Sequence, residues 1–239
     1  MKISIGHLYP KLLNLYGDIG NIITLKKRCE WRGIDVEYNE INIGDSVGEY
    51  DLYFMGGGQD KQQEEVAREL YKNKDYFINL RDSGAVFLGI CGGYQLFGHY
   101  YQPHDKDKLL GISLLDAYTV AGKKRFIGNV TAKTDLVSPD SLVGFENHSG
   151  LTYLQGETKP LGIVSIGYGN NGQDKTEGAR YKNVFGTYLH GSFLPKNTHF
   201  ADLLIELALE KHYGEKIKLS KLDDDIENKT HELLVGKAY

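Results

Sequence analysis

The features that most constrain the fold are two short apolar runs, residues 52–55 and 85–90, each of which leads directly into a cluster of glycines. A wholly apolar run of this length is typical of a strand buried on both faces of a parallel sheet. Stretches of helical composition follow the two runs, at residues 59–71 and from residue 92 onward. Strand–helix alternation of this kind predicts an α/β fold with a mostly parallel central sheet flanked by helices.

The rest of the chain continues the alternation and then becomes richer in strand. Further strands are expected at residues 2–8, 35–43, 111–120, 126–134, 161–168 and 183–190, and further helices at residues 19–32, 75–82 and 198–213. The chain shows no internal repeat and no convincing linker, which favours a single domain over residues 1–214. We expect residues 215–239 to form a tail, with a short helix packed on the domain or extending from it.

Composition excludes several classes of function. With 28 Lys and Arg against 32 Asp and Glu, the formal charge is −4, so no basic field is available to hold nucleic acid. No apolar run reaches the roughly 18 residues that a membrane helix needs, and the first residues are too polar for a signal peptide. Two cysteines are too few for a disulfide framework. We therefore expect a reduced, cytoplasmic protein with no membrane span and no nucleic-acid partner.

The strongest local signal is the sequence Gly-Ile-Cys-Gly-Gly at residues 89–93, between an expected strand and an expected helix. A nucleophile elbow has this arrangement, because the sharp turn needs small neighbours around an exposed nucleophile. The turn would present the thiol of Cys91 at the carboxyl end of the sheet, where open α/β folds bind ligands. The alternative for Cys91 is a buried structural cysteine beside a glycine-rich turn. Cys29 lies in the helix expected before Gly33 and has no activating neighbours in the sequence.

A thiol nucleophile needs a base, and the chain has eight histidines. His190 is the first candidate, because it ends an apolar strand and precedes a glycine, as Cys91 does. His148 is the second candidate. The remaining histidines are expected to be solvated or structural.

Gly56, Gly57 and Gly58 follow the apolar strand at residues 52–55. Glycines here would allow close approach of the backbone and suit an oxyanion hole, with the amide of Gly92 as a second donor. The alternative is a plain flexible turn. A phosphate-binding loop is excluded, because no Gly-Lys-Ser or Gly-Lys-Thr is present.

Taken together, these motifs resemble those of a known family. Gly-x-Cys-x-Gly-x-Gln at residues 89–95 resembles the nucleophile segment of class I glutamine amidotransferases, which have a flavodoxin-like single domain. Gly-Thr-Tyr-Leu-His-Gly at residues 186–191 resembles the histidine segment of their cobyric acid synthase-like branch. Finer matches to the GatD family, the glutaminase subunits of lipid II isoglutaminyl synthases, lie at residues 12–21, 55–60, 90–95, 144–150, 167–171 and 194–197.

The resemblance implies roles for individual residues. Cys91 would attack the side-chain amide of L-glutamine, and His190 would carry the proton. Arg125 would contact the substrate, and a guanidinium suits the α-carboxylate because it can donate two parallel hydrogen bonds. Gln95, Gly57 and Gly92 would line the substrate pocket, without any metal.

One departure from the family pattern concerns the third member of the triad. Many class I enzymes follow the histidine with Pro-Glu, and this glutamate orients the imidazole. Here Gly191 and Ser192 stand in those places. Either a Cys–His dyad suffices, or an acid from elsewhere, such as Glu146, orients His190.

The resemblance also implies a partner. In the GatD family a Mur ligase-like subunit, MurT, uses ATP and Mg²⁺ to activate the D-glutamate of lipid II, so no cofactor is expected on this chain. Residues 12–21 carry no obvious catalytic group, so we expect them to contribute to the partner interface; the alternative is a loop that starts a helix, with Asp18 as its cap. Rival functions are a glutaminase of corrinoid amidation, a non-catalytic scaffold, and a cysteine-elbow hydrolase of esters or lactones.

Overall fold

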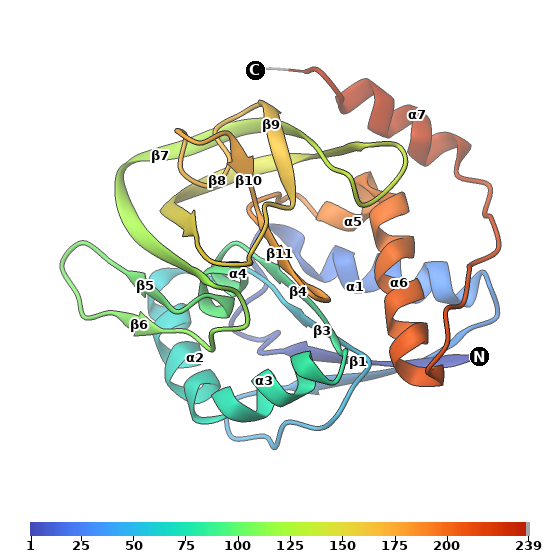
Figure 1. Cartoon of the computed structure of the whole chain (residues 1–239), viewed down its shortest axis with the longest axis horizontal. Helices are drawn as coiled ribbons and strands as arrows, with labels where there is room; N and C mark the ends of the chain where they lie inside the picture. Colours follow the sequence, from blue (N-terminus) through green and yellow to red (C-terminus); the bar gives the residue numbers. More distant parts are fainter. Residues whose placement is uncertain (238–239) are drawn as a thin grey trace.

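The computed structural model describes residues 1–237, without the side chains of Tyr16 and Asp60 (Figure 1). Its strands are β1 (Lys2–Leu8), β2 (Asp35–Ile41), β3 (Leu52–Met55), β4 (Val86–Ile90), β5 (Tyr100–Gln102), β6 (Leu109–Leu110), β7 (Ala117–Lys133), β8 (Ser141–Leu154), β9 (Gly162–Ile166), β10 (Thr176–Glu177), β11 (Ala179–Tyr181) and β12 (Val184–Thr187). Its helices are η1 (Leu15–Gly17), α1 (Ile19–Glu30), α2 (Asp60–Lys72), α3 (Lys74–Asp82), α4 (Gly92–Phe97), α5 (Phe193–Lys196), α6 (Thr198–Tyr213) and α7 (Asp225–Leu234).

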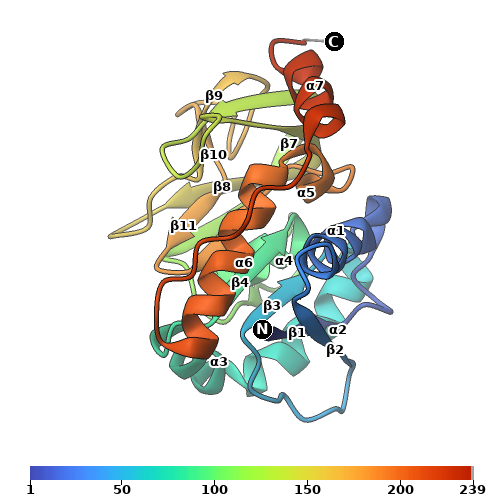
Figure 2. The same cartoon turned by 90° about the vertical axis from the view of Figure 1, so that its right-hand side faces the viewer.

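The central sheet has six strands in the order β11-β12-β4-β3-β1-β2. All neighbours in it are parallel except the edge pair β11 and β12. Helices α1 and α6 lie on one side of this sheet, and α2 and α3 lie on the other (Figures 1 and 2). The predicted fold class, a mostly parallel sheet flanked by helices, is confirmed.

Two apolar cores fill the space between these helices and the sheet. One joins Ile5 and Leu88 of the strands to Leu204 of α6. The other joins Tyr53 and Phe87 to Phe77 of α3. Because the strands contribute to both cores, their side chains are buried on both faces, which is why β3 and β4 are continuous apolar runs.

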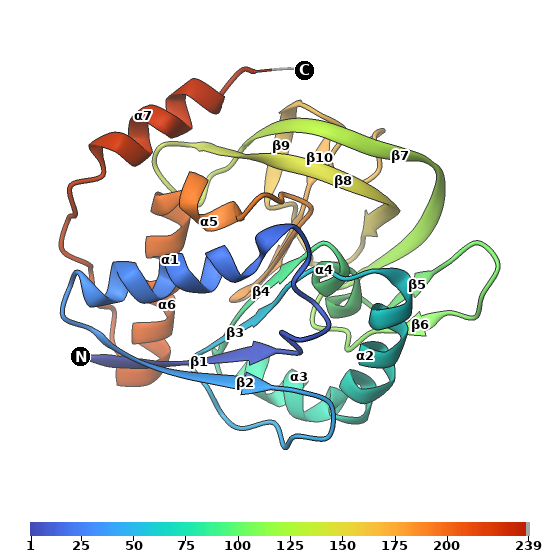
Figure 3. The same ribbon diagram turned by 180° about the vertical axis from the view of Figure 1, so that it is seen from behind.

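The second sheet was not part of the prediction. It is mainly antiparallel, with β10-β9-β7-β5-β6 in order and β8 paired to β7. Strand β7 is long and curved, arching over the molecule beside β8 (Figure 3), and a register shift interrupts their pairing between Ala121 and Phe126. The two strands expected at residues 111–120 and 126–134 therefore form one bent strand, and β8, β5 and β6 had not been expected.

Strand register places four chain segments at one edge of the central sheet. Met55 of β3 lies opposite Gly89 of β4, and Ile90 lies opposite Thr187 of β12. Leu8 at the end of β1 lies opposite Met55. The residues that follow these strands therefore emerge together, and each of the sequence motifs follows one of them.

The last helix, α7, packs against the body of the protein through a buried histidine. One nitrogen of His231 lies 2.7 Å from the Lys196 carbonyl, and the other lies 2.7 Å from the Ser141 hydroxyl. No helix among residues 1–237 is long and apolar enough to cross a membrane.

Candidate active site

Cys91 occupies a strained turn between β4 and α4. Its backbone has φ 50° and ψ −103°, a conformation that a residue with a side chain rarely adopts. Its neighbours must be small: a Cβ on Gly89 would lie 2.8 Å from the Phe97 ring, and one on Gly93 would collide with the Met55 carbonyl. The turn therefore has the geometry of the nucleophile elbow that the sequence predicts.

His190 follows β12, the neighbour of β4. Its backbone amide donates to the Phe145 carbonyl at 2.9 Å, which anchors the end of this segment to β8 of the second sheet. The amide of Cys91 donates to the Thr187 carbonyl at 2.8 Å, which fixes one segment relative to the other. The two residues predicted as nucleophile and base thus leave adjacent parallel strands at the same edge.

The side chains of Cys91 and His190 converge on Gly57. A Cβ on Gly57 would lie 3.3 Å from Cys91 Cβ and 3.4 Å from His190 Cε1. A larger residue at this position would therefore lie in tight contact with both side chains.

The imidazole of His190 is neutral over the physiological pH range. Burial, together with the smaller effects of the nearby His148 and Lys196, lowers the pKa of His190 to about 4. A neutral imidazole has a lone pair available, which is the state that a general base needs before it accepts a proton.

These side chains line a cavity of about 590 Å³, and residues from both sheets form its walls. The cavity is lined by Leu15, Gly57, Gly58, Gln59, Lys61, Gln63, Cys91, Gln95, Tyr101, Arg125, Asn147, His148, Ser149, Gly150 and His190. Of the residues predicted for the site, Cys91, His190, Arg125, Gln95 and Gly57 all line it. Gly92 is not among the lining residues; it follows Cys91 as the first residue of α4.

Arg125 enters the cavity from the second sheet and is exposed to solvent. Its Nη1 donates to Asn147 Oδ1 at 2.8 Å, which steadies one side of the guanidinium. The remaining donors can face an anionic group in the cavity, so the position suits recognition of a carboxylate.

Gln95 is buried and makes hydrogen bonds on both sides of its amide. It accepts from Gln63 Nε2 at 2.8 Å and donates to the Tyr188 hydroxyl at 3.1 Å. These bonds hold Gln95 in the cavity wall and link α4 to α2 and to the segment that carries His190.

The amide of Gly57 differs from the expectation. Its N–H donates to Asp18 Oδ2 at 2.7 Å, so this donor does not point into the cavity as an oxyanion hole requires. The nitrogen of Gly58 lies 3.3 Å from where a Cβ on Gly92 would be, so the Gly58 and Gly92 amides are close neighbours instead. The sequence alone could not show which of the three consecutive glycines directs its amide toward the cavity.

His148 lines the same cavity but is held differently from His190. Its Nδ1 donates to the Gly150 carbonyl at 2.8 Å. Its ring stacks on Tyr188 at 3.6 Å between centroids, and its Nε2 lies 3.7 Å from Glu146 Oε2. The ring is thus part of the cavity wall.

The acid proposed to orient His190 is engaged elsewhere. Glu146 is fully buried, and its two carboxylate oxygens accept hydrogen bonds from the amides of Tyr168 and Gly169 at 2.8 and 3.0 Å. The carboxylate that approaches His190 is that of Asp18, whose Oδ1 lies 4.0 Å from His190 Nδ1. Asp18 was not among the predicted site residues, although it follows β1 at the same edge of the sheet.

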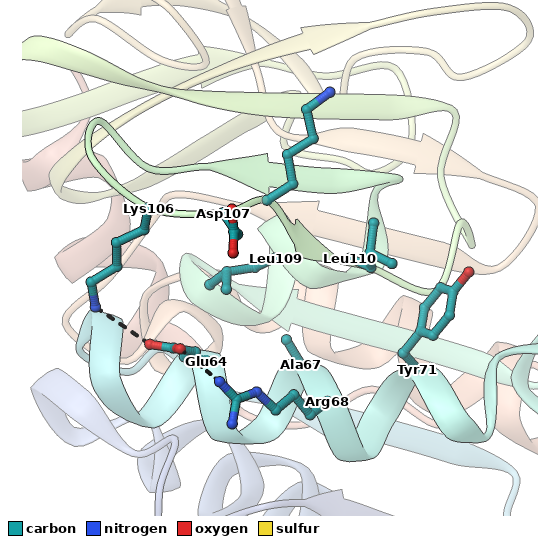
Figure 4. A pocket seen from close by; sticks show the side chains of 9 residues that line it. Glu64, Ala67, Arg68, Tyr71, Lys106, Asp107, Leu109 and Leu110 are labelled. Atoms are coloured by element: carbon teal, nitrogen blue, oxygen red, sulfur yellow. Dashed lines mark hydrogen bonds and ion pairs between the residues drawn. The ribbon is translucent and has the colours of Figure 1, made fainter.

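A second cavity, of about 670 Å³, lies between α2 and the β5–β6 hairpin (Figure 4). Three of its charged groups pair with one another: Glu64 lies 2.9 Å from Arg68 and 3.3 Å from Lys106. Neither a cysteine nor a histidine lines it, so it offers no counterpart to the Cys91–His190 arrangement. Among residues 1–237, no group of three or more His, Cys, Asp or Glu side chains could hold a metal ion.

The fold and the site together define a class I glutamine amidotransferase. Residues 4–198 match the family described as the CobB/CobQ-like glutamine amidotransferase domain, and the chain belongs to that family. It is a glutamine-hydrolysing amidotransferase subunit. A crystal structure of a glutamine amidotransferase from Thermotoga maritima shares the fold, with a TM-score of 0.55 at 16% identity over 98% of this chain and 99% of that one.

Two relatives place the chain within the family more narrowly. It is 41% identical to the lipid II isoglutaminyl synthase (glutamine-hydrolyzing) subunit GatD of Staphylococcus aureus, over 99% of this chain and 96% of that protein. It is 40% identical to the subunit of the same name from Streptococcus pneumoniae, over 93% of this chain and 86% of that protein. The resemblance to the GatD family is confirmed.

Proposed function

We propose that this chain is the glutaminase subunit of a lipid II isoglutaminyl synthase, with Cys91 as nucleophile and His190 as general base. The observation that carries the proposal is the convergence of the Cys91 and His190 side chains on Gly57, at one wall of a cavity that Arg125 enters from the other sheet. The names of the two GatD relatives supply the pathway.

In the first half of the reaction His190 takes the proton of the Cys91 thiol. The sulfur then attacks the side-chain amide carbon of L-glutamine, forming a tetrahedral intermediate whose oxyanion accepts from the Gly58 and Gly92 amides. When the C–N bond breaks, the imidazolium of His190 gives its proton to the leaving nitrogen, and ammonia departs. The product on the protein is a γ-glutamyl thioester.

In the second half, water completes the reaction. Neutral His190 takes a proton from a water molecule, the oxygen attacks the thioester carbon, and the C–S bond breaks. The thiol is regenerated when the proton returns to sulfur, and glutamate leaves. Arg125 holds the α-carboxylate of the substrate throughout, and Gln95 helps to shape the wall of the pocket.

Amide synthesis needs a second subunit. We expect a MurT-like Mur ligase partner that binds ATP and Mg²⁺, activates the D-glutamate carboxylate of lipid II, and receives ammonia to form D-isoglutamine. Free ammonia is mostly protonated near neutral pH and is then no nucleophile, so delivery within a complex is needed. Because ATP is cytoplasmic, we place the reaction in the cytoplasm.

The surface around the cavity suits contact with such a partner. Ile127 and Phe145 lie on the strands that carry Arg125 and Asn147, and they are 55% and 38% exposed. Exposed apolar side chains beside a catalytic cavity are typical of an interface. We propose that the partner covers this rim together with residues 12–21, of which Leu15 lines the cavity.

The test is reconstitution of lipid II amidation. The chain alone should form no amidated lipid II, and the pair of this chain with a Mur ligase-like subunit should form it from glutamine and ATP. Cys91→Ser in the pair should abolish the glutamine-supported reaction, while added ammonium restores amidation because the ligase half is intact. Amidation by the chain alone, or a glutamine-supported reaction that survives Cys91→Ser, would overturn the proposal.

A further inference from the structure

Asp18 stands in the segment between β1 and α1, where the sequence suggested only a helix cap. It does occupy the residue before α1, but its side chain makes no capping hydrogen bond. The Ile19 amide at the start of the helix is satisfied instead by Asn14 Oδ1 at 2.8 Å. The carboxylate of Asp18 is therefore free of the role that its position in the sequence suggests.

The carboxylate is turned into the protein, toward the site. Asp18 is fully buried, and its Oδ2 accepts from the Gly57 amide at 2.7 Å. Its Oδ1 has no hydrogen-bond partner among residues 1–237 and lies 4.0 Å from His190 Nδ1. A buried carboxylate oxygen left in this state lowers stability, so its retention points to a function.

Gly57 is the meeting point of all three side chains. The Cβ position that lies 3.3 Å from Cys91 Cβ and 3.4 Å from His190 Cε1 is also 3.5 Å from Asp18 Oδ2. Cys91 and His190 follow the carboxyl ends of β4 and β12, and Asp18 lies in the segment that connects β1 to α1. All three therefore meet at the same edge of the parallel sheet.

Ser192 stands at the position of the glutamate that is absent from this chain. Its position is where many class I enzymes have the glutamate that orients the histidine. Here the Ser192 hydroxyl donates to the Gly17 carbonyl at 2.7 Å and so holds the loop that carries Asp18. Ser192, the second residue after the histidine, thus holds the loop that carries the Asp18 carboxylate. The rival acid, Glu146, already accepts hydrogen bonds from two amides.

We propose that Asp18 is the positioning residue for His190 and takes the place of the absent glutamate. Its carboxylate holds the proton of the neutral imidazole on Nδ1, so that Nε2 faces the Cys91 thiol, and it stabilises the imidazolium once the thiol proton has been transferred. The proposal rests on the catalytic roles proposed above for Cys91 and His190.

A pH dependence follows from the environment of the carboxylate. Burial raises the pKa of Asp18 to about 7, against the lowering effect of the Gly57 amide. Glutamine hydrolysis should therefore rise with pH through about 7, as Asp18 ionises, while His190 stays neutral. The other titratable groups around the pair are Cys91 after β4, His148 in β8 and Lys196 in α5.

The first experiment measures glutamate release by the full chain across pH 5–9 for wild type, Asp18→Asn and Glu177→Gln. Asn keeps the size of Asp, and its carbonyl oxygen can still accept from the Gly57 amide. The group that then faces His190 Nδ1 is an NH2 donor, which cannot accept a hydrogen bond from a proton on Nδ1. We expect Asp18→Asn to lower kcat about 10²–10⁴-fold and to leave KM for glutamine within about threefold. The variant should also lose the rise in rate near pH 7, which is called the pH 7 limb of the profile.

Glu177→Gln is the matched control. Burial raises the pKa of Glu177 to about 7 as well, but its carboxylate accepts from Thr187 and Tyr188 in the central sheet. This variant should keep the limb. Loss of the limb in Glu177→Gln and its persistence in Asp18→Asn would overturn the inference.

A second measurement reports on the His190 ring of the wild-type chain and does not use Asp18→Asn. In ¹⁵N-histidine spectra of the wild-type chain, with His190 assigned by its loss in His190→Ala, the neutral ring should carry its proton on Nδ1. A proton on Nε2 would overturn the positioning role. If Cys91→Ser and His190→Ala retain full hydrolysis, the proposed function itself fails; if they abolish it while Asp18→Asn is like wild type, only the role of Asp18 fails.

Discussion

The hydroxyl of Ser192 donates a hydrogen bond to the carbonyl of Gly17, 2.7 Å away. This bond joins the turn after His190 to the turn before Asp18, two segments that leave different strands of the central sheet. A Cβ on Gly20, one turn further on, would collide with the same hydroxyl, so the contact is also closely packed. A bond outside the side chains of His190 and Asp18 therefore helps to hold these two residues relative to each other.

The two cysteines should differ completely in reactivity. Cys29 is fully buried in an apolar core, and burial raises its pKa to about 12, whereas Cys91 is partly exposed at the cavity. A chloroketone analogue of glutamine should label Cys91 alone, as peptide mapping would show. Cys29→Ala should be labelled like wild type, and an adduct on Cys29 would contradict the assignment of the nucleophile.

Replacing the two cavity histidines one at a time should show which of them acts as the base and which only lines the cavity. His190→Ala should lower kcat by about 10²–10⁴-fold, because it removes the proton carrier. His148→Ala should lower kcat much less, since Nδ1 of His148 is bound to the Gly150 carbonyl and its ring stacks on Tyr188. Steady-state glutamate release for both variants gives the comparison. A larger loss in His148→Ala would reverse the two roles.

Arg125→Ala should mainly weaken glutamine binding. A carboxylate contact is present in the ground state and in the transition state alike, so KM should rise about 10–100-fold with kcat nearly unchanged. Lys124→Ala is the control, because it removes the same charge next along the strand, where Lys124 lies over the Tyr168 ring. Unchanged kinetic constants in Arg125→Ala would exclude the carboxylate contact.

Asp18 should also lower the stability of the fold above neutral pH. Its pKa rises from 3.8 to about 7 on folding, so the protonated form is favoured in the folded chain and stability falls as pH rises between these values. Asp18→Asn should therefore melt several degrees above wild type at pH 8, and the difference should shrink toward pH 4. Thermal melts at a series of pH values measure this.

The matched control for that series is Asp75→Asn, which removes an exposed carboxylate on α3. It should shift the melting temperature little at any pH. A lower melting temperature for Asp18→Asn than for wild type at pH 8 would show that the ionised carboxylate is stabilised by its surroundings.

The central sheet and the meeting of Cys91 and His190 at one cavity could be predicted because their signals are local. The strands that precede Gly56 and Cys91 are continuous apolar runs. One is followed by three glycines and the other by a cysteine between glycines, and both patterns are unusual enough to be noticed. His190 ends a run of the same kind. Since parallel strands end at the same edge of a sheet, position in the sequence was sufficient to bring these residues together.

Strand β8 was missed because its pattern is inverted. Along it the inward-facing residues include Glu146 and His148, while Phe145 is exposed. The usual alternation of apolar inward and polar outward residues is therefore reversed just where the strand forms the cavity wall. A functional site that needs buried polar groups removes the signal by which the strand would be recognised.

Asp18 was missed for a different reason. Its role depends on a contact with His190 that spans most of the chain, and no periodicity or spacing reports such a contact. Within its own segment it has the features of a helix cap. Only the structure shows that the cap is supplied by Asn14 and that the carboxylate points elsewhere.

The backbone of Cys91 has a consequence for the history of such chains. At φ 50° and ψ −103° a glycine would be more comfortable than any residue with a Cβ, so Cys91→Gly should raise the melting temperature while ending catalysis. In a chain that served only as a scaffold, Cys91→Gly would stabilise the fold at no cost to function. The fold by itself therefore gives no reason for a cysteine at this backbone position, whereas a nucleophile does.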